Sequence, residues 1–365
     1  MKLSTFKTSK FILLGLLATS IFTSCKKDKD EEPTPTPAPS GYTTPTTYSF
    51  TNVNYSGQSI RLTMLDSISN YMSTGNSGVV LNASIMKNMY SNTGSPFGNP
   101  TLDASGKQLK NKTYAADQIY FDALFDSLAV ISQSAGGPAS NGVAGIENGR
   151  LFDKNGVELS QVIKKQMMGA VFYYQALDTY LTNIPTQDNT TIVAGQGTVQ
   201  EHSADEAFGY FGVPVDFPTN VTGLKYWGAY CNEVNTPISC SAPTMNAFLK
   251  LRAAISNKDN TTRDAQIVII KNQWERVVAA SAILELTEAK AAFGTGNLTE
   301  MKHVLSEGIG FINALKYKTD KQITNAQITN ALTSLGTNFY TISIANIDNA
   351  INTINAVYGF NLSAF

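Results

Sequence analysis

The sequence predicts an all-α protein, with about eight to ten helices arranged in one or two antiparallel bundles. Two observations support this fold class. Apolar residues recur at spacings of three and four along most of the chain, which is the period of a helix that buries one face. Runs of alternating apolar and polar residues, which would indicate a sheet, are too short to predict one.

The helical period is clearest in six segments, which are residues 60–72, 120–128, 163–181, 264–293, 297–315 and 344–354. Pro185 ends the third segment, because proline cannot continue a helix. The fourth and longest has the apolar spacing of a bundle seam. Asn297 and Glu300 form a capping-box-like start for the fifth.

Two long glycine-rich loops, residues 133–150 and 185–200, interrupt these helices. Loops of this length within a compact domain more often carry function than serve as simple connections. We therefore expect residues near them to contribute to a site.

Residues 1–24 have the pattern of a lipoprotein signal peptide, and Cys25 is the expected lipidation site. Basic Lys7 and Lys10 precede an apolar run from Phe11 to Phe22, and small residues come directly before Cys25. The apolar run, about 12 residues long, is short for a membrane span, which needs about 20. A plain secretory signal is the alternative.

Residues 25–45 are predicted to be a tether, and residues 46–365 a helical-bundle domain. The charged run K-K-D-K-D-E-E follows Cys25. After the charged run comes a proline-rich stretch, which favours an extended spacer. The charged run resembles the signal that sends some Gram-negative lipoproteins to the cell surface, so we expect an outer-membrane, surface-exposed protein. Its alternative is a solvated linker.

The charge balance is typical neither of a nucleic-acid-binding protein nor of a strongly acidic one. The chain has 27 basic and 28 acidic residues, and its formal net charge is −1. No nucleic-acid partner is expected from this composition.

Two cysteines remain if Cys25 is lipidated, and we expect Cys231 and Cys240 to form a disulfide. Pro237 lies between them, so this segment is predicted to be a loop. A metal-binding pair is the alternative, although the nearby sequence offers no third and fourth soft ligand.

Standard catalytic motifs are absent from the sequence, and the two histidines are His202 and His303. On a helix, His202, Asp205 and Glu206 share a face with Gly209. An imidazole and two carboxylates there predict a site for iron or a divalent metal ion. The alternative is that acidic residues in the first turn complement the helix dipole and that His202 is a partnered polar residue.

A metal site on this helix would need ligands from a second helix, and Glu285 and Glu288 are the candidates. Glu288 continues the apolar stripe of residues 264–293, and Glu285 lies beside it. His303 falls opposite the apolar stripe of its own helix, so it is predicted to be an exposed surface histidine.

The segment D-E-A-F-G-Y-F-G-V-P at residues 205–214, together with residues 48–57, resembles a family of uncharacterised surface lipoproteins of Gram-negative bacteria. The chain is also distantly similar to the imelysin-like proteins, which are all-helical, linked to iron uptake and marked by G-x-H-x-x-E on a helix. Here Glu201 stands in place of the glycine, His202 matches the histidine and Asp205 occupies the acidic position. This resemblance implies binding more than catalysis.

Together these features predict a lipid-anchored outer-membrane protein that binds a small ligand, such as iron or an iron-bearing molecule, beside a TonB-dependent receptor. One alternative is a metal-dependent hydrolase of imelysin-like type that uses His202 and Glu206. Another is a glycan-binding or structural surface protein, for which Tyr226, Trp227 and Tyr230 would be the contacts.

Overall fold

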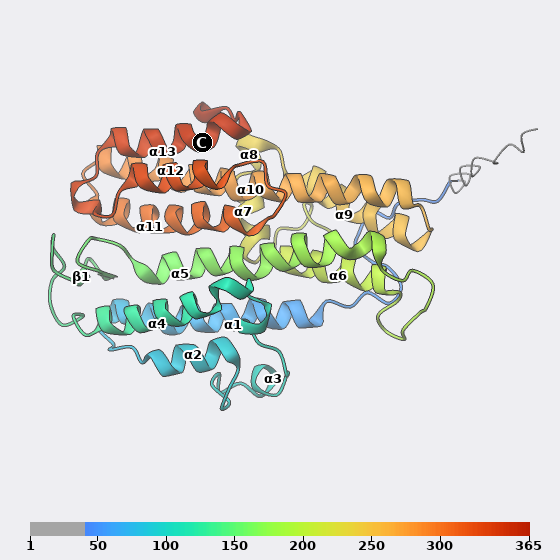
Figure 1. The fold of residues 1–365 in the computed structure, drawn as a ribbon, viewed down its shortest axis with the longest axis horizontal. Helices are drawn as coiled ribbons and strands as arrows, with labels where there is room; N and C mark the ends of the chain where they lie inside the picture. Colours follow the sequence, from blue (N-terminus) through green and yellow to red (C-terminus); the bar gives the residue numbers. More distant parts are fainter. Residues whose placement is uncertain (1–40) are drawn as a thin grey trace, which may run out of the picture. The chain divides into compact units, whose positions relative to one another are not determined.

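Helices account for most of the structure, a computed structural model that describes residues 41–365 (Figure 1). The predicted all-α fold is confirmed, and all six predicted helical segments are helical. The described residues contain 13 α-helices, more than expected, because short helices also form between the long ones. The predicted signal peptide, Cys25 and most of the tether lie outside the described residues.

The first four helices follow an extended N-terminal segment and form one side of the bundle (Figure 1). They are α1 (Ser56–Ser73), α2 (Ala83–Ser91), α3 (Pro100–Asp103) and α4 (Gln118–Ser132). Between α4 and the next helix lies a small antiparallel hairpin, β1 (Gly145–Glu147) paired with β2 (Arg150–Phe152). The first glycine-rich loop therefore contains a short sheet that its sequence does not predict.

The central helix begins as α5 (Leu159–Met167) and continues through two π-helical segments, Met168–Tyr173 and Gln175–Leu181. A π-helical turn shifts the backbone hydrogen bonds by one residue and often occurs at functional sites. One consequence here is that the Ala170 carbonyl accepts a hydrogen bond from the backbone N–H of Tyr114, 2.9 Å away. The loop before α4 is thereby joined to the centre of the bundle.

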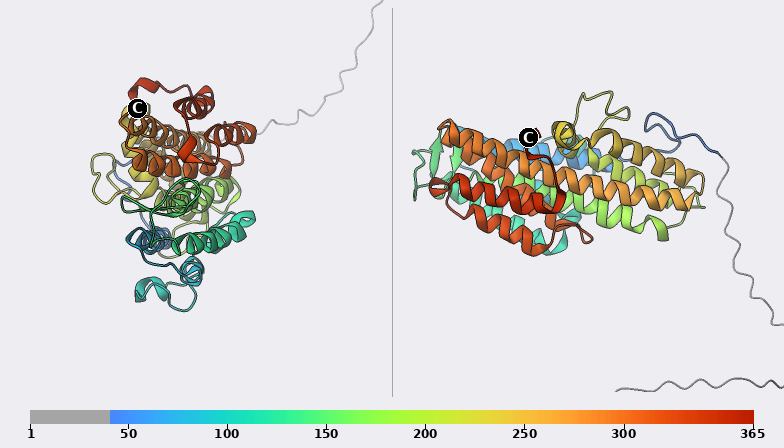
Figure 2. Two further views of the ribbon diagram at one scale, coloured as in Figure 1. Left: turned by 90° about the vertical axis from the view of Figure 1, so that its left-hand side faces the viewer. Right: turned by 90° about the horizontal axis from the view of Figure 1, so that it is seen from above.

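The remaining helices pack around α10 (Asn260–Gly294), which is 35 residues long. In Figures 1 and 2, α6 and α9 lie toward one end of α10, and α11, α12 and α13 toward the other. Their bounds are α6 (Val199–Phe211), α7 (Tyr226–Glu233), α8 (Asn235–Ile238), α9 (Ser241–Ser256), α11 (Leu298–Ala314), α12 (Asn325–Leu335) and α13 (Ile344–Tyr358).

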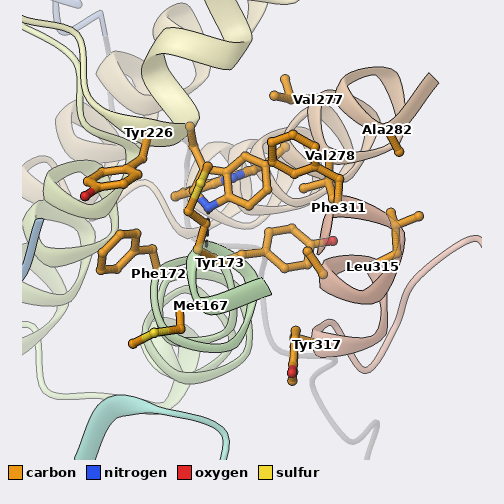
Figure 3. Packing of buried hydrophobic residues seen from close by; sticks show 14 of the residues in the cluster. Met167, Phe172, Tyr173, Tyr226, Val277, Val278, Ala282, Phe311, Leu315 and Tyr317 are labelled. Carbon is orange, nitrogen blue, oxygen red and sulfur yellow. Dashed lines mark hydrogen bonds between the residues drawn. The ribbon is translucent and has the colours of Figure 1, made fainter. Parts of the chain in front are cut away.

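The core between the central helix and α10 is rich in aromatic side chains (Figure 3). Tyr173 packs near both Trp227 and Trp274, with ring centroids 6.1 and 6.2 Å apart. Trp227 is fully buried and its indole N–H donates to the Met168 carbonyl. Tyr226 is also buried, so this aromatic segment contributes to the core instead of offering an exposed contact surface for a glycan.

The segment between Cys231 and Cys240 is largely helical, because α7 and α8 occupy most of it and Pro237 lies within α8. The loop predicted there is therefore wrong. The two cysteines are buried free thiols whose Sγ atoms are 3.2 Å apart, compared with about 2.05 Å in a disulfide. The disulfide is not formed in this structure and stays a prediction for the oxidised protein.

None of the helices within residues 41–365 combines the length and the apolar character that crossing a membrane requires.

Candidate functional site

Helix α6 begins with a capping box that fixes its first turn. The Thr198 side chain accepts a hydrogen bond from the Glu201 N–H, and the Glu201 carboxylate accepts one from the Thr198 N–H at 2.9 Å. The T-x-x-E spacing is a sequence signal for a helix start. Glu201, at the glycine position of the imelysin-like motif, therefore has a structural role in capping.

Asp205 lies on the side of α6 that faces the core. Its carboxylate is buried and accepts hydrogen bonds from the Tyr48 hydroxyl at 2.9 Å, the Asn54 N–H at 3.2 Å and the Arg252 guanidinium at 3.0 Å. Burial raises the pKa of Asp205 to about 6, and these donors oppose the rise. The carboxylate predicted to bind a metal is instead the anchor of an internal polar network.

The two sequence segments that carry the family resemblance meet at this network. The Tyr48 ring stacks on Phe208 with a centroid distance of 3.8 Å, and a side chain at Gly209 would collide with Tyr55, whose Cβ would be 2.5 Å away. Glycine at position 209 is therefore required for the close contact between α6 and the start of α1.

This close contact places His202 and Glu206 beside the N-terminus of α1. His202 Nε2 is 4.0 Å from Glu206 Oε1, and the Gln58 side-chain amide donates to that same oxygen at 2.6 Å. The His202 Nδ1 atom is buried and has no hydrogen-bond partner within the described residues.

The structure brings together only two of the three predicted metal ligands. His202 and Glu206 are neighbours, but Asp205 points into the core because three donors there satisfy its charge. Within residues 41–365, no group of three or more histidine, cysteine, aspartate or glutamate side chains is arranged to hold a metal ion. The predicted site of His202, Asp205 and Glu206 is therefore not assembled.

A polar pocket with a volume of about 170 Å³ lies in front of His202 and Glu206. We call it the basic pocket, because three cationic side chains line it and Glu206 is its one carboxylate among the described residues. The cations come from α1 and from the loop before α4, and they are Arg61, Lys107 and Lys112. Asn54, Ser56, Gly57, Gln58 and Gln196 complete the lining.

The cations of the basic pocket are not neutralised by ion pairs within the described residues. Arg61 donates to two backbone carbonyls, those of Gln108 and Gly57, at 2.9 and 3.2 Å. Burial lowers the pKa of Lys112, the positive charges of Arg61 and Lys107 lower it further, and Glu206 opposes the fall. The three charges are thus close enough to repel one another, and an anion between them would relieve this repulsion.

The N-terminus of α1 adds to the positive potential of the pocket. Its first residues line the pocket, and the helix dipole there favours negative charge. A Cβ at Gly57 would be 3.2 Å from Lys107 Cε, so glycine leaves room for the lysine beside the helix start. The chemical character of the pocket is therefore that of an anion-binding site.

Sequence reasoning found His202 and Glu206 but missed the cations. Two of them belong to the short basic stretch K-Q-L-K-N-K at residues 107–112, which was a detectable signal. Arg61 was hidden among the residues of a helix with a regular apolar period. Their convergence depends on α1, the loop and α6 packing together, which local patterns do not reveal.

The proposed second-helix ligands lie in a different cluster, not at His202. Glu285 is adjacent to Glu307, and burial together with this neighbouring carboxylate raises the pKa of Glu285 to about 10. The neutral form is thus favoured at Glu285, while Lys165 forms an ion pair of 2.9 Å with Glu307. The pKa of Glu288 is also raised, first by burial and then by nearby glutamates.

His303 belongs to this second cluster, and the prediction that it is exposed is wrong. Its Nδ1 is 2.7 Å from buried Glu158, its Nε2 is 3.5 Å from Glu307, and its side chain is only 14% exposed. The side of α11 opposite its apolar stripe is covered by the hairpin and by α5, so a polar face is buried here.

The fold and the basic pocket define a helical-bundle protein with a small cationic pocket. Residues 45–361 match the family described as "Domain of unknown function (DUF4856)", and the chain belongs to that family. No curated protein and no solved structure matches the chain.

Proposed function

We propose that this protein is a membrane-anchored binding protein whose basic pocket holds an anionic group of a small ligand. The observation that carries the proposal is the convergence of Arg61, Lys107 and Lys112 on one pocket that contains a single carboxylate among the described residues. Arginine and lysine recognise carboxylate and phosphate oxygens through charge-assisted hydrogen bonds. The amide and hydroxyl groups of the pocket can supply further donors.

This pocket favours an anion over a bare metal ion. A cation entering beside Glu206 would meet the positive charges of Arg61, Lys107 and Lys112, and it would find only one carboxylate and one imidazole. An iron-bearing ligand remains part of the proposal if it is an anionic chelate, such as ferric citrate, held through its carboxylates. Delivery of such a ligand to a TonB-dependent receptor would agree with the imelysin-like resemblance and with the expected location.

The proposal is tested by calorimetric titration of citrate, ferric citrate and inorganic phosphate into the soluble domain. We expect the double substitution K107A/K112A to weaken binding at least tenfold, since it removes two of the three cations. Lys110→Ala is the matched control: Lys110 lies in the same basic stretch but pairs with Asp122 at 2.6 Å and does not line the pocket. This variant should bind like wild type.

Glu206→Gln distinguishes anion binding from metal binding. Removing the one carboxylate of the pocket should strengthen the binding of an anion several-fold, whereas a metal ion would lose a ligand and bind more weakly. Failure of all three anions to bind at millimolar concentrations would reject the proposal, as would tighter binding of ferric or zinc ions to wild type than to Glu206→Gln.

We also propose that the protein is held in the outer membrane, with its domain at the cell surface, through a lipid on Cys25. Cys25→Ala is expected to abolish acyl labelling and to release the protein from the membrane fraction. Ser24→Ala is a suitable control, because it keeps a small residue before the cysteine. Unchanged membrane association of Cys25→Ala would contradict the anchor.

A further inference from the structure

Another cavity lies elsewhere, between the central helix, the end of α11 and α12. Its volume of about 570 Å³ is within the range of about 300–1,000 Å³ that is typical of small-molecule sites. We call it the tyrosine pocket, because Tyr114 and Tyr317 line it. None of its lining residues is shared with the basic pocket.

The π-helical part of the central helix positions two sides of the tyrosine pocket. The Ala170 carbonyl accepts a hydrogen bond from the backbone N–H of Tyr114. The Tyr114 ring packs edge to face with Tyr174 and Tyr317, yet Tyr114 is 41% exposed. Asp178, in the second π segment, accepts hydrogen bonds from the N–H and hydroxyl of Thr319 at 2.8 and 2.5 Å. The irregular backbone thus fixes both an aromatic wall and the loop after α11.

The charges of the tyrosine pocket balance, in contrast to the basic pocket. Two carboxylates, Asp117 and Asp178, and two ammonium groups, Lys316 and Lys321, line it. Asp117 pairs with Lys316 at 2.7 Å and accepts a hydrogen bond from the Tyr317 hydroxyl at 2.5 Å. The pocket therefore offers no net charge that would select an anion or a cation.

Neutral polar groups provide the remaining chemistry of the tyrosine pocket. The lining includes the amides of Asn313 and Asn325 and the hydroxyl of Thr329, each able to donate and to accept hydrogen bonds. An exposed tyrosine ring adds an apolar surface beside them. A ligand that matches this combination carries many hydroxyl groups, has an apolar C–H face and has no net charge.

We infer that the tyrosine pocket is a binding site for a neutral saccharide. The sugar's C–H face packs on Tyr114, and its hydroxyl groups bond to the amides, carboxylates and threonine hydroxyls of the pocket. This site is independent of the proposed anion site. The earlier expectation of a glycan-binding surface rested on Tyr226, Trp227 and Tyr230. The first two are buried and Tyr230 is half-buried, so a different set of residues carries this inference.

The test is calorimetric titration of maltotriose, cellotriose, xylotriose and N,N′-diacetylchitobiose into the soluble domain. At least one of these sugars is expected to bind with a Kd of about 1 mM or tighter. Tyr114→Ala should weaken that binding at least tenfold, because it removes the ring. Tyr114→Phe should retain it, because the Tyr114 hydroxyl has no hydrogen-bond partner among the described residues and the ring is kept.

A blocking substitution gives a second measurement that does not depend on removing a ring. Thr329→Trp fills the pocket from α12, and its matched control is Asn330→Trp, the adjacent exposed residue of the same helix, which does not line the pocket. We expect the first to abolish sugar binding and the second to leave it unchanged. Sugar binding that survives Thr329→Trp would overturn the inference. So would the failure of all four sugars to bind at about 10 mM. Citrate titrations of the same variants report the basic pocket separately.

Discussion

Arg252→Ala is expected to lower the free energy of unfolding by about 3–5 kcal/mol, because it leaves buried carboxylate charge without its partner. Arg252 and Asp205 are both essentially inaccessible, with side chains 1% and 0% exposed. The guanidinium also bonds to Glu201 at 2.6 Å and to the Thr51 carbonyl at 3.1 Å. One side chain therefore joins α9, α6 and the N-terminal segment.

Urea unfolding followed by circular dichroism measures this effect. Lys290→Ala is the control, because the Lys290–Asp348 pair has side chains 36% and 41% exposed and such surface pairs contribute about 0–1 kcal/mol. The double variant R252M/D205N should be more stable than Arg252→Ala, since it removes the uncompensated charge. A loss below about 1 kcal/mol for Arg252→Ala would show that the network is not a major source of stability.

Glu275→Ala, within α10, is expected to have a comparable effect of about 3–5 kcal/mol. Glu275 forms a buried ion pair of 2.7 Å with Lys318, and the two side chains are 0% and 1% exposed. The same carboxylate accepts hydrogen bonds from the Tyr358 hydroxyl at 2.7 Å and from the Gln322 N–H at 2.6 Å. Truncation would leave the buried Lys318 ammonium with only the exposed Asp320 carboxylate, 3.3 Å away, and would remove the hydrogen bonds to Tyr358 of α13 and to the loop before α12.

The charge is the cause of this expected loss, and a paired substitution tests it. E275M/K318M replaces both charges with apolar side chains of similar length and should recover much of the stability that Glu275→Ala loses. Chemical denaturation of wild type, E275M, K318M and E275M/K318M completes the cycle. If the double variant were less stable than Glu275→Ala, the lost hydrogen bonds, and not the Lys318 ammonium without Glu275, would account for the loss.

The sequence was sufficient to predict six of the helical segments, but it did not indicate α9, a helix of 16 residues. Residues 264–293 show an uninterrupted apolar period, and the helix there extends from Asn260 to Gly294. The Asn297 side chain accepts a hydrogen bond from the Glu300 N–H, as the capping spacing predicts. These features are local, because apolar periodicity and capping depend on residues that are near one another in the chain.

The sequence placed His202 and Glu206 on one helix face but could not determine the role of Asp205. Residues 205 and 206 are adjacent, yet Asp205 enters the core and Glu206 lines the basic pocket. The difference depends on Arg252 and Tyr48, which are distant in sequence. A carboxylate on a helix becomes an internal anchor when packing supplies its donors, and periodicity alone does not show which residues will supply them.

The sequence by itself determined the helical class of the protein and the approximate positions of its six periodic helical segments, and the location implied by its first 25 residues stays a prediction. Only the tertiary structure decided the chemistry of its sites. It gathered Arg61, Lys107 and Lys112 around His202, and it separated Glu285 and Glu288 from that histidine. The physical reason is that helix formation follows from local periodicity, whereas the charge of a pocket is the sum of side chains from segments that packing brings together.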